Sequence, residues 1–127
     1  MKMKLRTTSS SIRLRLSQSD VRNFADNGVI EETLNIDPSS GQYFRYRLYR
    51  DETAEYMTAR FEDRCLSISV PAAAAHIWAS GDEVGIEAKE ASDGPTILVE
   101  KDFACLKPRS GDEDVDTFPN PEAKAAY

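Results

Sequence analysis

The sequence predicts an α+β fold with a mostly antiparallel sheet, and three observations support this class. Short segments with alternating apolar and polar residues, the pattern of strands with one buried face, recur along the chain. Two other segments carry apolar residues three and four positions apart, which is typical of short helices. The order strand, strand, helix, strand, strand occurs twice. We therefore expect a duplicated ββαββ unit.

Matching positions in the two halves define the expected repeats. Leu66 follows Ile12 at an offset of 54 residues, and the same offset relates Trp78 to Phe24. The internal repeats would cover about residues 1–53 and 55–106. Their eight strands could merge into one strongly curved sheet or close as a barrel, and closure would remove exposed sheet edges.

In the first half, alternation predicts a strand at residues 1–6 and another at 12–16. Ser17 can cap the helix that follows, because its hydroxyl can accept a hydrogen bond from a free backbone amide. Phe24 lies on the apolar stripe of this helix, and Gly28 ends it in a left-handed conformation. Two further strands are predicted at residues 30–36 and 43–49.

The second half repeats this order. Pro71 suits the first helical position, since its missing amide hydrogen would have no partner there. Trp78 lies on the apolar stripe of this second helix, which ends at Gly81. The strands around it are predicted at residues 57–61, 66–70, 84–88 and 96–103.

The composition is that of one soluble domain. The chain has 127 residues, of which 40% are hydrophobic and 30% charged. No apolar run approaches the roughly 20 residues of a membrane helix, and the basic start lacks the apolar core of a signal peptide. We expect a cytoplasmic protein that binds no membrane, with a single domain at residues 1–107. Residues 108–127 are acidic and contain prolines, which predicts an extended or disordered tail with Phe118 as a candidate anchor.

Charge is distributed unevenly. The net charge of −6 argues against nucleic acid as a partner, because phosphates are neutralised by clustered Lys and Arg. Residues 1–16 nevertheless carry bases and no acid, whereas residues 110–122 carry acids and no base. The acidic tail could fold back onto the basic surface, compete with an anionic ligand, or only add solubility.

The strongest functional signal is a set of basic residues that alternate with apolar residues in the predicted strands. If these strands are neighbours, the basic side chains converge on one sheet face, where guanidinium groups can bind phosphate or carboxylate in bidentate geometry. The alternative is a solvated face whose bases pair with acids across strands. The candidate ligand-binding residues are Lys4, Arg6, Arg13, Arg15, Arg45, Arg47 and Arg60.

Other chemistry has weaker support. His76 is the only histidine, and it lies off the apolar stripe of its helix, as a partly exposed structural histidine would. Cys65 and Cys105 lack the spacing of a zinc site and are expected to be reduced and buried. Glu100 and Asp102 alternate on one side of the last strand, but 22 acids make such pairs common by chance. We assign no catalytic residue, no metal site and no cofactor.

Two resemblances add to these patterns. The run LVEKDFACL at residues 98–106, the later FPNP at 118–121 and the opening SIRLRLSQS at 11–19 resemble a family of small uncharacterised bacterial proteins. This resemblance implies a bacterial cytosolic protein and transfers no catalytic residue.

Duplicated ββαββ units with basic strands also resemble the triphosphate-tunnel, or CYTH, barrel. Its members hold a polyphosphate inside the barrel with Lys and Arg, and bind a divalent metal through a Glu-x-Glu-x-Lys strand. The corresponding strand here is KMKLR at residues 2–6, which lacks those acidic ligands.

Two functional hypotheses follow. The first is a small cytoplasmic binding or interaction module, not an enzyme, whose basic sheet face binds a phosphorylated or acidic small molecule or protein. The alternative is a CYTH-like metal-dependent phosphohydrolase that acts on a polyphosphate.

Overall fold

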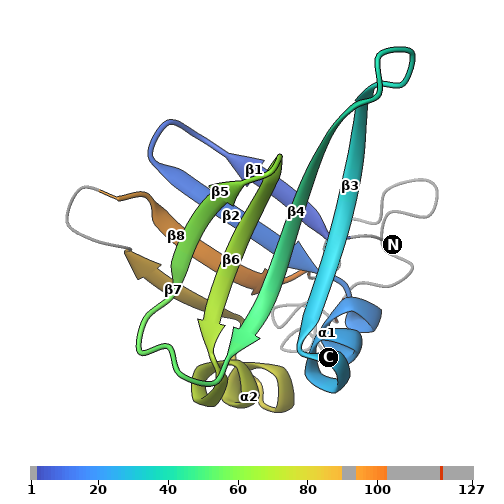
Figure 1. Ribbon diagram of the computed structural model, residues 1–127. Coiled ribbons are helices and arrows are strands. Elements are labelled where there is room, and N and C mark those ends of the chain that lie inside the picture. The colour runs from blue at the N-terminus through green and yellow to red at the C-terminus, as the bar shows by residue number, and fades with distance from the viewer. Residues whose placement is uncertain (1–2, 90–93, 103–117, 119–127) are drawn as a thin grey trace, which may run out of the picture.

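The computed structural model describes residues 3–89, 94–102 and 118 (Figure 1). Its elements follow the predicted order. They are β1 (Lys4–Thr7), β2 (Ser11–Leu16), α1 (Gln18–Asn27), β3 (Val29–Asp37), β4 (Gln42–Asp51), β5 (Thr58–Glu62), β6 (Cys65–Pro71), α2 (Ala72–Ser80), β7 (Gly85–Lys89) and β8 (Thr96–Lys101).

The strands form two four-stranded sheets. Sheet A has the order β1-β2-β8-β7, and sheet B has the order β3-β4-β6-β5. In each sheet the central pair is parallel and both outer pairs are antiparallel. The α+β class and the mostly antiparallel pairing are therefore confirmed.

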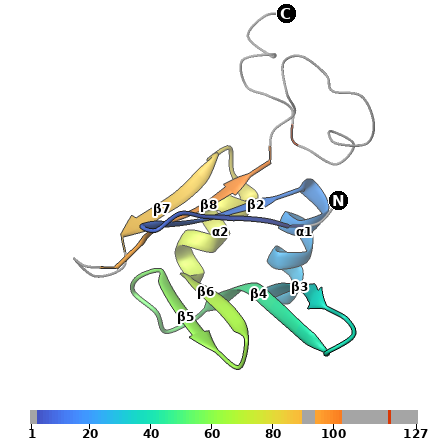
Figure 2. The ribbon, with the colours of Figure 1, turned by 90° about the horizontal axis from the view of Figure 1, so that it is seen from above.

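The predicted strongly curved sheet or closed barrel is wrong. Figure 2 shows the two sheets lying opposite one another, with both helices between them. In the described part of the chain, hydrogen bonding joins four strands in each sheet and leaves the sheets separate. Both helices lie between the sheets at one end of the molecule and hold them apart there. A closed barrel would need the edge strands of the two sheets to pair with each other.

The connectivity has an internal regularity. Each strand of the first half can be exchanged with the strand at the same place in the second half, β1 with β5, β2 with β6, and so on. The order β1-β2-β8-β7 of sheet A then becomes β5-β6-β4-β3, which is the order of sheet B read from its other edge. Each sheet thus takes two strands from each half of the chain, and its central parallel pair joins the halves. The superposition of the two halves stays a prediction.

The core fills the space between the sheets. Alternation along β2 and β8 turns one set of apolar side chains inward, and β4 and β6 supply the opposing set. The side chains that are at most 2% exposed include Leu14, Leu16, Ile97 and Val99 of sheet A and Leu48, Ile68 and Val70 of sheet B.

The ends of the helices follow from the sequence. The Ser17 hydroxyl accepts a hydrogen bond from the Asp20 amide (3.2 Å), so it caps α1 as predicted. Gly28 closes α1 at φ 79°, where its amide donates to the Phe24 carbonyl (2.8 Å). Pro71 instead ends β6 in an extended conformation, and α2 begins one residue later than predicted.

The two helices contact each other through aromatic rings. Phe24 of α1 and Trp78 of α2 are 1% and 0% exposed, and their ring centroids lie 6.2 Å apart in an edge-to-face arrangement. The Trp78 indole also donates a hydrogen bond to the Val84 carbonyl (3.1 Å). This pair occupies the core positions that the repeat predicts for both residues.

Of the predicted tail at residues 108–127, only Phe118 lies within the described residues. Its amide donates to the Asp102 carbonyl (2.8 Å), and its ring lies 5.5 Å from the ammonium nitrogen of Lys101. The same nitrogen lies 5.9 Å from the Trp78 ring and donates to the Gly81 carbonyl (2.8 Å). Phe118 is therefore anchored beside the core. The domain limits of 1–107 stay a prediction.

No helix among the described residues is long and apolar enough to cross a membrane.

Truncation of either aromatic residue of the helix pair should destabilise the fold strongly. Phe24→Ala or Trp78→Ala leaves a large cavity where a fully buried ring was, so we expect a loss of about 3–5 kcal/mol in the free energy of unfolding. His76→Ala, on the exposed side of α2, is the control and should change it by less than about 0.5 kcal/mol. Urea unfolding measures all three variants. Equal midpoints for Phe24→Ala and His76→Ala would contradict the assigned core.

Lys101 should make stability rise with pH in the alkaline range. Burial lowers the pKa of Lys101 below 10.5, although Asp82 and Glu83 oppose this shift. The folded protein then releases this proton at lower pH than the unfolded chain. Burial of the charged amine therefore destabilises the folded protein in full below the folded-state pKa of Lys101, and this destabilisation disappears as the pH approaches 10.5. The free energy of unfolding of the wild type, relative to Lys101→Met, should therefore increase as the pH rises from the folded-state pKa of Lys101 toward 10.5. A constant or decreasing difference would refute this assignment.

Candidate functional site

The structure divides the predicted basic set between two outer faces. Lys4, Arg6, Arg13 and Arg15 lie on β1 and β2 of sheet A, whereas Arg45, Arg47 and Arg60 lie on β4 and β5 of sheet B. Because the inner faces of the sheets enclose the core, these groups lie on opposite sides of the molecule. One shared face was predicted on the condition that these strands are neighbours, and their division between two sheets does not meet that condition.

On sheet A, the pairing of β1 with β2 places bases directly opposite one another. Lys4 is in register with Arg15, and Arg6 is in register with Arg13. Like charges at directly opposed positions of an antiparallel pair destabilise a sheet. The four side chains form a compact cationic cluster, which we call the basic face.

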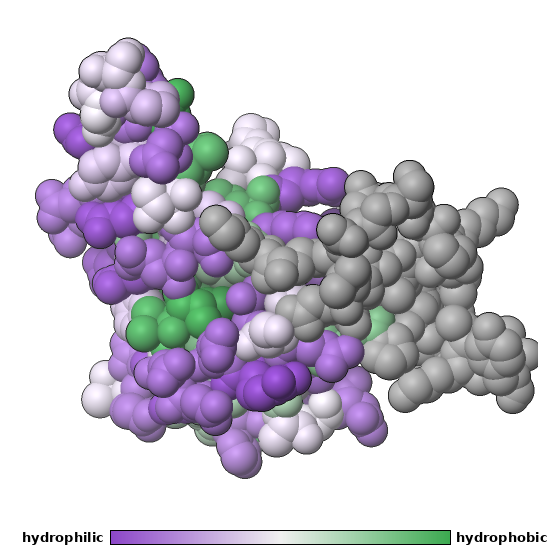
Figure 3. Space-filling view, turned by 90° about the vertical axis from the view of Figure 1, so that its right-hand side faces the viewer, coloured by the Kyte–Doolittle hydropathy of each residue, from purple (hydrophilic) through white to green (hydrophobic). Residues whose placement is uncertain are grey.

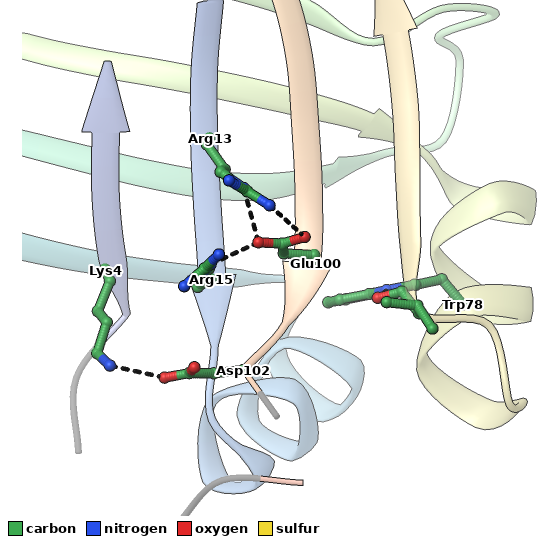
Figure 4. Close-up of polar contacts among 7 residues, drawn as sticks. Lys4, Arg13, Arg15, Trp78, Glu100 and Asp102 are labelled. Carbon is green, nitrogen blue, oxygen red and sulfur yellow. Dashed lines mark hydrogen bonds and ion pairs between the residues drawn. The ribbon is translucent and has the colours of Figure 1, made fainter. Parts of the chain in front are cut away.

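Glu100 of β8 partly balances this cluster. It is in register with Arg15, and its oxygen Oε1 lies 2.7 Å from Nε of Arg13 and 2.5 Å from Nε of Arg15. Figure 4 shows both guanidinium groups converging on this one carboxylate. The Glu100 side chain is only 12% exposed, so the ion pairs are screened less than surface pairs are. One half-buried carboxylate therefore orients two arginines.

A second carboxylate lies beside the cluster. Asp102 is 7% exposed, and its Oδ2 lies 2.9 Å from the ammonium nitrogen of Lys4. Among the described residues, Arg6 has no ion-pair partner. Four cations thus meet two carboxylates, and the basic face keeps a surplus of two positive charges.

The basic face is concave. A hollow of about 290 Å³ is lined by Lys4, Leu5, Arg6, Arg13 and Arg15. Three guanidinium groups and one ammonium group therefore surround a space that is open to solvent. Such a space can admit a phosphate or carboxylate group, whose oxygens accept charge-assisted hydrogen bonds from Arg and Lys.

The outer face of sheet B uses its arginines differently. The Arg45 and Arg47 guanidinium groups lie over the rings of Tyr43 and Tyr49, at 5.3 and 5.2 Å. Nε of Arg47 also donates to the Ser67 hydroxyl (2.9 Å). These groups are stacked on their own sheet, with tyrosine rings as partners.

Sequence reasoning missed Arg64 as a member of this stack. Its guanidinium lies 5.2 Å from the centre of the Tyr43 ring, so two arginines contact one ring. Arg64 is in the turn between β5 and β6 at φ 63°, a conformation uncommon for residues other than glycine. The short gap between the strands predicted at residues 57–61 and 66–70 was the available signal, but the backbone angle that directs this side chain depends on the pairing of β5 with β6.

The other candidate residues do not assemble into a site. His76 is exposed on α2, and Cys65 is a half-buried free thiol on β6. Cys105 lies outside the described residues. Glu100 and Asp102 bind the bases of sheet A, as the predicted pairing across strands requires. No group of three or more possible metal ligands occurs in the described part of the chain.

Removal of the Glu100 charge should have two effects. Glu100→Gln leaves Arg13 and Arg15 without their shared carboxylate, so we expect a loss of about 1 kcal/mol in the free energy of unfolding. The same change raises the charge surplus of the basic face and should strengthen the binding of a multivalent anion. Glu62→Gln, at an exposed position of sheet B, is the matched control. Urea unfolding at low salt checks the stability, and identical midpoints for the two variants would contradict the role of Glu100.

Comparison with known proteins identifies a family and no characterised relative. No curated protein and no solved structure matches the chain. The model of a family of unknown function, DUF7009, matches residues 3–122, which include both sheets and both helices. The expected membership of an uncharacterised family is thereby confirmed. Because the match spans nearly the whole sequence, the chain belongs to this family of unknown function, DUF7009.

Proposed function

We propose that this protein is a small binding module that holds an anionic ligand on the basic face of sheet A. The observation that carries the proposal is the hollow in which four cations meet only two carboxylates. The opposed bases of β1 and β2 repel one another, and an anion bound between them would reduce this repulsion.

The charge surplus indicates the class of ligand. Two uncompensated positive charges favour a ligand with two or more negative charges close together. Phosphate groups suit Arg best, since their oxygens match the fork of a guanidinium. We therefore expect a small molecule with adjacent phosphate or carboxylate groups, such as a diphosphate or a triphosphate.

The arrangement supports binding more than catalysis. Both nearby carboxylates are engaged by bases, and their oxygens face those bases in Figure 4. The basic side chains also point away from the space between the sheets, whereas the resemblance to the CYTH barrel implies an interior basic site. The phosphohydrolase alternative stays a prediction that the experiment below also tests.

Two finer expectations belong to the same proposal. We propose a cytoplasmic location, and we regard the two halves of the chain as duplicated units. The duplication is supported by the strand orders, because exchanging the two halves of the chain converts the order of one sheet into the order of the other.

Calorimetric titration with pyrophosphate and with triphosphate should detect this ligand site. We expect binding that weakens at least tenfold in the double variant Arg6→Ala with Arg13→Ala, which removes two of the four cations. The matched control is Arg45→Ala with Arg47→Ala, because it removes two cations from the opposite side of the molecule. The control should bind as the wild type does.

Three outcomes would overturn the proposal. They are the absence of heat at millimolar ligand, an equal loss of binding in both double variants, and binding that higher salt does not weaken. The titration is repeated with magnesium, and release of inorganic phosphate from triphosphate is followed. Metal-dependent release that requires Arg6 and Arg13 would favour the phosphohydrolase instead.

A further inference from the structure

A cleft opens between the two sheets at the end opposite the helices. Its volume is about 460 Å³, which lies in the range of small-molecule sites in proteins. The hairpin that joins β1 to β2 forms one wall, and the inner face of sheet B forms the other. The cleft is lined by Thr7, Thr8, Ser9, Ser10, Ser11, Ile12, Phe44, Phe61, Leu66, Gly94 and Pro95.

The sheet B wall is an aromatic platform. The Phe44 and Phe61 rings lie 6.0 Å apart with only 24° between their planes, and Tyr46 continues the row at 6.2 Å and 29° from Phe44. Phe61 is 64% exposed although its ring faces the cleft. Figure 3 shows hydrophobic surface in the notch between the tall hairpin end of sheet B and the paler surface beside it. Exposed apolar surface that is contiguous in this way marks binding sites.

The opposite wall is rich in hydroxyl groups. The Thr8 and Ser11 hydroxyls lie 2.6 Å apart, and the Ser10 amide donates to the Thr8 hydroxyl (3.2 Å). These bonds hold the hairpin hydroxyls in place. Each hydroxyl oxygen has two lone pairs, so acceptor capacity remains for a ligand.

Among the residues that the structure describes, the cleft lining contains no charged side chain, although 30% of the residues in the chain are charged. A charged ligand would lose hydration on entering and would gain no ion pair, which is costly. The lining therefore selects against ions, in contrast to the basic face. The two sites differ in position and in chemistry.

We propose that this cleft binds an uncharged, ring-containing small molecule. Its flat apolar face would lie on Phe44 and Phe61, and its polar edge would donate hydrogen bonds to the hairpin hydroxyls. This site does not depend on the anion-binding function, because its lining and the basic face have no residue in common.

A pair of fluorescent probes tests the proposal on the full chain. N-phenyl-1-naphthylamine is neutral and aromatic and has one N–H donor. 1-Anilinonaphthalene-8-sulfonate has the same rings with an added sulfonate. We expect the neutral probe to bind with enhanced emission, and its affinity to fall at least tenfold in Phe61→Ala. Because Phe61 is largely exposed, this variant should stay folded. Tyr56→Ala, which removes another exposed ring outside the cleft lining, should bind as the wild type does.

The sulfonated probe separates the two sites. In the double variant Arg6→Ala with Arg13→Ala, the sulfonated probe can no longer bind the basic face. The binding of this probe that remains and depends on Phe61 should be at least tenfold weaker than that of the neutral probe. Equal affinity of the two probes at the cleft, or neutral-probe binding unchanged in Phe61→Ala, would overturn the proposal. Sedimentation at micromolar concentration provides a further test. A dimer that Phe61→Ala converts to a monomer would show that a second copy of the chain covers the cleft, and would also overturn it.

Discussion

The packing of Phe24 against Trp78 is the constraint on which the arrangement of the molecule depends. The two rings fill the space between the sheets at one end, and each is the largest buried side chain of its helix. The apolar inner faces of the sheets can then close around the helices at this end. The sheets have no helix between them at the other end, so their separation leaves a cleft there.

The same packing decides where charge can lie. Since the apolar side chains of β1 and β2 face the core, the bases that alternate with them have only the outer face of sheet A available. The opposition of Lys4 to Arg15 and of Arg6 to Arg13 is the consequence. Glu100 reduces this repulsion by contacting two arginines at once, and it reaches them because β8 pairs with β2 in parallel.

The molecule thus presents two concave surfaces with opposite preferences. The basic face has charge and hydrogen-bond donors, whereas the described lining of the cleft has aromatic rings and hydroxyls and no charged side chain. Sheet B has a third arrangement, in which Arg45 and Arg64 stack on Tyr43. These differences arise from which residues share a sheet face or a sheet end.

Local patterns in the sequence determined the elements and their exposed sides. Ser17 and Gly28 marked the ends of α1. The alternation of Arg13 and Arg15 with apolar residues showed that these two side chains point away from the core. Such patterns depend on neighbours a few residues apart, so they can be recognised without knowing the fold.

Only the tertiary structure decided which strands became neighbours. The pairing of β2 with β8 joins Arg15 to Glu100 across most of the chain, and the separation of the sheets places Arg45 on the far side from Arg13. A period of two residues specifies the face of a strand but not its partner, because every strand with the same alternation could pair equally well.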